Sequence, residues 1–263
     1  MKRVIEIHGH RGSRGTHPEN TLPSFAEALA AGADYFELDV QLTQDDVPVV
    51  HHDAAISSRH CREGGKTPAR EIPIRSVDAA EVARFDCGSI PQPDFPEQIL
   101  QPGLRIPTLA EVLDWLGRRP GSAGVNIEIK IEGATGALTP DPALFADRVW
   151  DLVRARGLES RVQLQSFDPR PLARLVELGC RGRLSYLFDR DADFAGEAAR
   201  LGVGFVGPAF RLLTPANIAS CHSRGVKVVP WTVNAAADWD RLAGYGVDGL
   251  ITDFPRKLAA HLG

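Results

Sequence analysis

The chain has 263 residues, of which 43% are hydrophobic and 24% charged, and its formal net charge is −4. This is the composition of a globular protein that can bury a sizeable core without staples. It lacks the excess of Lys and Arg that marks nucleic-acid-binding domains, so we expect no nucleic-acid partner.

The cysteine spacing and the N-terminal residues indicate the cellular compartment in which we expect the protein. Cys61, Cys87, Cys180 and Cys221 are far apart and form no CxxC pair. This spacing argues against a disulfide framework or a zinc site and favours reduced thiols in a cytosol. Glu6 interrupts any signal-peptide core, and no apolar run approaches the ~18 residues that a membrane span needs. We therefore expect a cytoplasmic protein without integral membrane association, and leave open whether it forms a homodimer.

Short apolar runs alternate with helical periodicity along the chain, which is typical of βα units and a parallel sheet. Eight runs are candidate strands, namely Val4–His8, Tyr35–Leu42, Gly124–Ile131, Arg161–Ser166, Arg183–Leu187, Gly204–Val206, Lys227–Thr232 and Gly249–Thr252. A (β/α)8 barrel typically needs ~250 residues. The pattern therefore predicts an α/β fold, a (β/α)8 TIM barrel that forms a single domain over residues 1–263.

Helix boundaries are marked between these strands. Cap residues predict helix starts at Thr108, Asp168 and Thr214, the first with a Glu three positions on and the others followed by Pro. Gly32 and Gly225 predict helix ends.

Residues 54–107 break the rhythm, because they are rich in Pro, Gly and Arg and contain no clean βα unit. Loops of this length inside a compact domain are unusual and often functional. We interpret the segment as an insertion between the second strand and its helix that caps one mouth of the barrel.

Polar motifs follow or end several candidate strands, which is where barrel enzymes place their active sites. After the first strand, His10 could exchange a proton near neutral pH and Arg11 offers a fork of donors suited to phosphate. A polar loop with a surface histidine is the alternative. After Val49-Val50, one of His51 and His52 is a candidate second acid/base, unless this is a loop pair without function.

Acidic residues occupy the inward face of two strands. Glu37 and Asp39 are two positions apart and therefore share a face, as do Glu128 and Lys130. Burying unpaired acids is costly, and a hard divalent cation would remove that cost. The alternatives are pairing with inward Lys and Arg, and a Glu128–Lys130 ion pair. Together with the histidines, three carboxylates suit metal-assisted phosphodiester hydrolysis.

The motifs together resemble the glycerophosphodiester phosphodiesterase family. The residues that carry the resemblance, which covers nearly the whole chain, are His10-Arg11-Gly12, Pro18-Glu19-Asn20-Thr21, Glu37-x-Asp39, His52-Asp53, Glu128-x-Lys130, Gln165-Ser166-Phe167-Asp168, Trp231-Thr232-Val233-Asn234 and Asp248 to Pro255. The resemblance implies a barrel with a small inserted subdomain after the second strand. It also implies hydrolysis of glycerophosphodiesters to sn-glycerol 3-phosphate and an alcohol.

The resemblance further implies roles for nine residues. By the family pattern, one divalent cation, Mg2+ or Ca2+, would be held by Glu37, Asp39 and Glu128. The general acid/base pair would be His10 and His52, the phosphate contacts Arg11 and Lys130, and the residues near the alcohol Phe167 and Trp231.

Three histidines depart from this pattern. His51 competes with His52, but alternation lets only one of them face the site, and the adjacent Asp53 favours His52. His17 is an extra histidine, and we interpret His8 as a packing residue.

Three alternative functions compete with hydrolysis of glycerophosphodiesters. The first alternative is a lysophospholipase D-type phosphodiesterase acting on lysophospholipids, for which the same constellation would need a wider, more apolar mouth. The second is a barrel that binds a phosphodiester without catalysis, which the complete set of acids and histidines disfavours. A sugar isomerase on the same fold is the third, and the His-Arg-Gly and Glu-x-Asp motifs argue against it.

Overall fold

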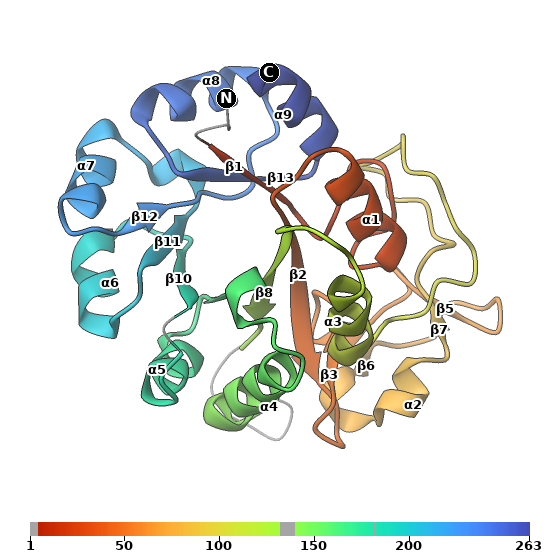
Figure 1. Cartoon of the computed structure of the whole chain (residues 1–263). Coiled ribbons are helices and arrows are strands. Elements are labelled where there is room, and N and C mark those ends of the chain that lie inside the picture. The colour runs from red at the N-terminus through yellow and green to blue at the C-terminus, as the bar shows by residue number, and fades with distance from the viewer. Residues whose placement is uncertain (1–4, 132–139, 181) are drawn as a thin grey trace.

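The computed structural model describes residues 5–131, 140–180 and 182–263. At its centre, eight parallel strands form a barrel with helices around the outside (Figure 1). The strands are β1 (Glu6–Gly9), β2 (Tyr35–Leu42), β8 (Gly124–Ile129), β9 (Val162–Ser166), β10 (Arg183–Phe188), β11 (Phe205–Pro208), β12 (Lys227–Val228) and β13 (Gly249–Thr252). Their order is β12-β11-β10-β9-β8-β2-β1-β13.

Backbone hydrogen bonds bring the two ends of this sheet together. The amide of Asp248 donates to the carbonyl of Val228 over 2.9 Å, and the amide of Ile251 donates to that of Pro230 over 3.0 Å. The (β/α)8 prediction is therefore confirmed.

All eight predicted strands are present, and the seventh differs most from its predicted length. The predicted run Lys227–Thr232 contains Pro230, which has no N–H to donate to a ladder. Regular pairing consequently stops at Val228. The predicted first residue of the first strand, Val4, lies outside the described residues.

The outer layer contains helices α1 (Leu22–Ala30), α3 (Leu109–Gly117), α4 (Pro142–Arg154), α5 (Pro169–Glu177), α6 (Phe194–Leu201), α7 (Pro215–Ser223), α8 (Ala236–Tyr245) and α9 (Pro255–Leu262), and short 3-10 turns at Glu159–Arg161 and Phe210–Leu212. The three predicted helix starts are confirmed. The Thr108 hydroxyl accepts from the amide of Glu111 over 3.2 Å, while the Glu111 carboxylate accepts from the amide of Thr108 over 2.9 Å. The Asp168 and Thr214 side chains likewise cap α5 and α7.

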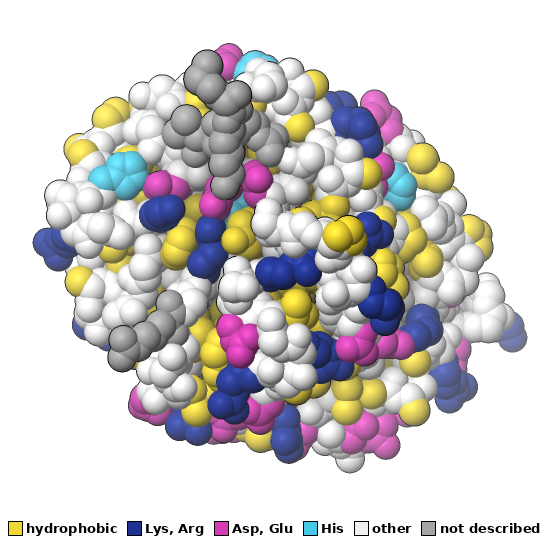
Figure 2. All heavy atoms as spheres, viewed as in Figure 1, with side chains coloured by type: hydrophobic (Ala, Val, Ile, Leu, Met, Phe, Trp, Pro, Cys, Tyr) yellow, Lys and Arg dark blue, Asp and Glu magenta, His cyan; other side chains and the backbone are white. Residues whose placement is uncertain are grey.

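No helix within the described ranges is both long and apolar enough to cross a bilayer. On the face of the molecule seen in Figure 2, Lys and Arg side chains are interspersed with Asp and Glu side chains.

Alternation along β2 divides the barrel wall into two chemical faces. Leu38, Val40 and Leu42 are buried in the hydrophobic cluster between strands and helices. Glu37 and Asp39, at the intervening positions, are also almost fully buried. A strand that is buried on both faces therefore carries its charges on the inside of the barrel.

Residues 54–107 form a small folded unit with its own apolar core (Figure 1). β3 (Pro48–Val50) first pairs antiparallel with β2. The elements that follow are β4 (Ala55–Ile56), β5 (Arg62–Glu63), β6 (Ile72–Pro73), a 3-10 turn (Ile74–Ser76), α2 (Ala79–Val82) and β7 (Phe85–Asp86). β4 pairs with β6 and β5 with β7, both antiparallel.

The expectation of reduced thiols is wrong for two of the four cysteines. Cys61 and Cys87 form a disulfide, with their Cα atoms 4.1 Å apart. The reason is the register of β5 and β7, which places Arg62 opposite Asp86 and therefore brings the residues just outside that pair face to face. Cys180 and Cys221 are buried free thiols.

We predict that this disulfide stabilises the inserted unit. The disulfide closes a loop of 26 residues. Because it lowers the entropy of the unfolded chain, it should raise the free energy of unfolding by roughly 3 kcal/mol. Dithiothreitol should therefore lower the thermal stability of the native protein and expose residues 54–107 to limited proteolysis. The double variant Cys61→Ser/Cys87→Ser is the control, because its stability should not respond to the reductant. Four free thiols in the native oxidised protein would contradict the prediction.

Candidate active site

A cavity of about 250 Å³ opens at the ends of the barrel strands. It is lined by His10, Arg11, Arg14, Glu37, Asp39, His52, Glu128, Lys130, Gln165, Phe167, Leu187, Trp231, Thr232 and Ile251. The structure thus brings all nine of the predicted site residues to one cavity. What each one does there remains a prediction.

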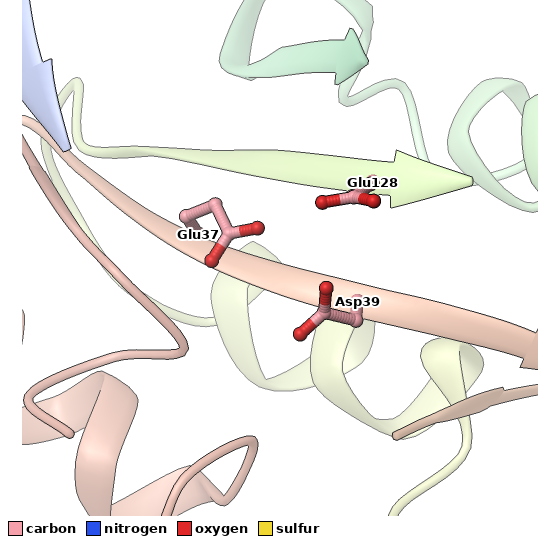
Figure 3. A group of neighbouring side chains, drawn as sticks. All are labelled: Glu37, Asp39 and Glu128. Atoms are coloured by element: carbon pink, nitrogen blue, oxygen red, sulfur yellow. The ribbon is translucent and has the colours of Figure 1, made fainter. Parts of the chain in front are cut away.

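Three carboxylates meet on the wall of this cavity (Figure 3). Asp39 on β2 lies opposite Glu128 on β8 in the parallel ladder, and Glu37 lies two residues before Asp39. One oxygen from each side chain lies within 4.8 Å of the others. Neighbouring strands therefore converge three acids on one point, as the alternation of β2 and β8 predicts.

The electrostatic environment shifts the pKa values of Glu37 and Asp39 in opposite directions. Burial, together with the negative charges of Asp39 and Glu128, raises the pKa of Glu37 well above its usual range. Burial acts in the same direction on Asp39, but the positive charges of Arg11 and Lys130 outweigh it and hold the pKa of Asp39 well below its usual range. The cationic side chains therefore outweigh burial at Asp39, whereas at Glu37 the charge of Arg11 does not.

The alternative of pairing with cationic side chains is partly realised. Lys130 Nζ lies 2.9 Å from Glu128 Oε1 and 3.7 Å from Asp39 Oδ1, and Arg11 Nε lies 3.3 Å from Asp39 Oδ2. Among the described residues no cationic side chain forms an ion pair with Glu37. Three acids with two cations leave a net negative charge, and an all-oxygen donor set suits a hard divalent ion. The residues present therefore fit a hard divalent cation.

The backbone at Arg11 adopts an uncommon conformation. Its φ is 49°, and its amide donates to the Glu37 carboxylate over 2.8 Å. Gly12 follows with φ of 89°, where a Cβ would stand 2.4 Å from the hydroxyl oxygen of Ser24. The His-Arg-Gly motif thus forms a tight turn in which the amide of Arg11 points toward the carboxylate of Glu37. Such backbone strain is often found at functional sites.

Each of the two predicted acid/base histidines has a carboxylate partner. Nδ1 of His10 lies 2.7 Å from Asp253, and Nδ1 of His52 lies 2.7 Å from Asp53. Asn234 in turn donates to Asp253 over 2.7 Å. A carboxylate at Nδ1 fixes the ring and leaves Nε2 for proton transfer.

The three histidines that depart from the family pattern do not line this cavity. His51 is buried in the wall of a separate, smaller cavity, and burial lowers the pKa of its imidazole to about 4. His8 is fully buried and stacks on Tyr35, as expected for a packing residue. His17 is hydrogen-bonded to Thr16 and does not line the cavity with His10. Of the two adjacent histidines, His52 lines the cavity and His51 does not.

Several polar residues of the site were not singled out from the sequence. Asn20 donates to Asp39 over 3.0 Å, and Gln165 donates to Glu37 over 3.3 Å. Glu19 accepts from Arg11 over 2.7 Å and from Arg14 over 2.6 Å. Glu19, Asn20 and Gln165 fall within motifs that carried the family resemblance, so those motifs could have identified them as site residues. Arg14 lies outside these motifs.

Comparison with known proteins gives the same family. The model of the glycerophosphoryl diester phosphodiesterase family matches residues 10–257. A glycerophosphodiester phosphodiesterase of Caldanaerobacter subterraneus is 31% identical over 95% of this chain and 94% of its own, and one from Bacillus subtilis is 28% identical over 96% and 84%. A crystal structure from Silicibacter pomeroyi described under the family's name has a TM-score of 0.90, is 30% identical and covers 100% of this chain and 94% of its own.

The fold and the site therefore define a phosphodiester hydrolase on a (β/α)8 barrel. The chain belongs to the glycerophosphoryl diester phosphodiesterase family.

The raised pKa of Glu37 generates a prediction for the protein without a cation. A carboxyl whose pKa is higher in the folded state destabilises the fold when it ionises. In EDTA, stability should therefore fall as the pH rises from about 4.3, the ordinary value for Glu, toward the raised value. Glu37→Gln should remove this loss and raise the melting temperature at pH ~8 by roughly 2–4 °C.

The matched control for this measurement is Glu177→Gln, because Glu177 is an exposed acid on α5. Its melting curve should follow that of the native protein at every pH. If Glu37→Gln instead melts below the native protein in EDTA at pH ~8, ionised Glu37 is not the source of the instability.

Proposed function

We propose that this protein hydrolyses glycerophosphodiesters to sn-glycerol 3-phosphate and an alcohol, with one divalent cation, Mg2+ or Ca2+. The observation that carries the proposal is the meeting, in one cavity, of three carboxylates, two carboxylate-held histidines and three cationic side chains. Each group on its own has a structural explanation, but together they can supply the charge stabilisation and the proton transfer that phosphodiester hydrolysis uses.

Glu37, Asp39 and Glu128 would hold the cation. When bound, it would polarise a phosphoryl oxygen and offset the charge that develops there. Gln165 and the Arg11 amide orient the Glu37 carboxylate, and Asn20 orients that of Asp39. These hydrogen bonds hold the acids in place.

His10 and His52 would carry the protons. One imidazole accepts the proton of the attacking hydroxyl as its oxygen bonds to phosphorus, and the other donates a proton to the alcohol oxygen as the phosphorus–oxygen bond breaks. Asp253 and Asp53 stabilise whichever ring is protonated. The attacking hydroxyl belongs to water or to the substrate's own glycerol, and a water molecule completes the overall reaction in either case.

The rest of the cavity would bind the two ends of the diester. Arg11 and Lys130 line it as phosphate contacts, and the rings of Phe167 and Trp231 lie 5.2 Å apart in an edge-to-face arrangement beside the space for the alcohol. The indole of Trp231 is fixed by donating to the carbonyl of Gly207 over 2.8 Å. A cavity of about 250 Å³ suits a deacylated diester better than a lysophospholipid with its acyl chain.

A panel assay tests the substrate. Glycerophosphocholine, glycerophosphoethanolamine and lysophosphatidylcholine should be compared in Mg2+, Ca2+ and Mn2+. We expect the two deacylated diesters to be hydrolysed with the larger kcat/KM. A higher kcat/KM for lysophosphatidylcholine would favour the lysophospholipase D alternative instead.

Removal of the cation or of one of its ligands should remove activity. EDTA should abolish hydrolysis of glycerophosphocholine, and added Mg2+ or Ca2+ should restore it. Glu128→Gln, which retains shape but loses the charge, should lower kcat/KM by at least about 100-fold and weaken cation binding measured by calorimetry. Full activity in EDTA would refute the metal-dependent mechanism.

The two adjacent histidines provide an internal control. His52→Ala should reduce kcat by about 100-fold or more, the usual contribution of a general acid or base. His51→Ala removes a ring outside the cavity and should mainly lower thermal stability. A larger loss of kcat in His51→Ala than in His52→Ala would reverse the assignment.

A further inference from the structure

We propose that Arg14 is a specificity residue that binds an anionic group on the alcohol portion of the substrate. The inference rests on the proposed function and extends it, because it names a class of glycerophosphodiester that this cavity would prefer. Arg14 lines the cavity but is not one of the two cationic residues assigned to the reacting phosphate.

Arg14 is held rigidly from three sides. Its Nε donates to Glu19 Oε2 over 2.6 Å, and its guanidinium carbon lies 4.7 Å from the ring centre of Phe95 in the inserted unit. Gln98, also in the inserted unit, donates to the backbone carbonyl of Arg14 over 2.7 Å. A guanidinium fixed in this way loses little side-chain entropy when a ligand binds.

The outer nitrogens of this guanidinium are available for a ligand. Over the described ranges of the chain, neither Nη atom of Arg14 makes a hydrogen bond, and the ion pair from Nη1 to Asp253 Oδ1 is long, at 4.0 Å. Arg11 differs, because its Nη1 donates to Glu19 and its Nε faces Asp39. The two arginines therefore have different capacities for an incoming anion.

Both carboxylates that pair with Arg14 are shared with another side chain, Glu19 with Arg11 and Asp253 with His10. Glu19 is a single carboxylate shared by two guanidiniums, and both of them lower its pKa well below the usual range despite its burial. Arg11 and Lys130 are further neutralised by the carboxylates of the cation site. The outer nitrogens of Arg14 can therefore donate to a second anion on the substrate, in addition to the single negative charge of the reacting phosphodiester.

The order of strands places Arg14 on the same side of β2 as Trp231, one of the two rings proposed to lie beside the alcohol. Arg14 follows β1, and the Asp253 that it approaches follows β13. The segment after β12, which hydrogen-bonds to β13, carries Trp231. Glu128 and Lys130 lie on the other side of β2. A negative group on the alcohol would therefore reach Arg14 while the phosphodiester occupies Arg11 and Lys130.

The test compares three diesters in Mg2+. They are glycerophosphoglycerol, whose alcohol is uncharged, glycerophosphocholine, whose alcohol is cationic, and glycerophosphoglycerophosphoglycerol, whose alcohol carries a second phosphodiester. The native enzyme should have the highest kcat/KM for the third. Arg14→Met keeps an apolar stem over Phe95 and should lower kcat/KM for the third substrate about tenfold relative to the other two, mainly through KM.

Two further variants separate specificity from folding. Arg14→Lys retains the charge and should recover part of the preference, and Arg14→Gln repeats the test with a neutral polar side chain should the Met variant melt early. Arg200→Met, on the exposed surface of α6, is the control and should leave all three kcat/KM values unchanged.

An equal loss of kcat/KM for all three substrates would overturn the inference, because it would assign Arg14 to the reacting phosphate or to holding the inserted unit. An unchanged ratio with unchanged rates would overturn it as well. Failure of the native enzyme to hydrolyse any of the three would instead refute the proposed function, and the inference with it.

Discussion

The site depends on the cost of placing three ionisable acids inside a barrel. Glu37, Asp39 and Glu128 are each less than a tenth exposed, and isolated charges at such depth are strongly disfavoured. Nearly every polar group around them reduces this cost, including an amide in a left-handed turn, two side-chain amides, a guanidinium and an ammonium group. The compensation is incomplete at Glu37, and that deficit is the strongest physical argument for a bound cation.

The inserted unit contributes to the same arrangement from outside the barrel. Phe95 lies beneath the guanidinium of Arg14 and also contacts the ring of Phe254, the residue after Asp253. The Phe254 ring packs directly against the backbone of Gly15, where a Cβ would stand 2.1 Å from the ring. Phe95 of the insertion thus packs against both the loop after β1 and the loop after β13. The loop after β13 also contains Asp253, the carboxylate partner of His10, so the insertion contacts the segment that holds this histidine.

Much of the barrel and of the cavity lining followed from the sequence, because a period of two along a strand decides which side chains share a face. That rule placed Glu37 with Asp39 and separated His51 from His52. It could not reveal the Cys61–Cys87 disulfide, which depends on the register of two very short strands, or the early end of β12, which depends on how Pro230 meets its neighbours. The free donors of Arg14 depend on its rotamer and packing, which no spacing encodes.

The two histidines obtain their carboxylates in different ways. Asp53 is the next residue after His52, so that pair requires no contact between distant parts of the chain. Asp253 is 243 positions after His10, and it arrives with the last strand of the barrel. The orientation of the His10 ring therefore depends on closure of the barrel by β13, whereas that of the His52 ring depends on its neighbour in the chain.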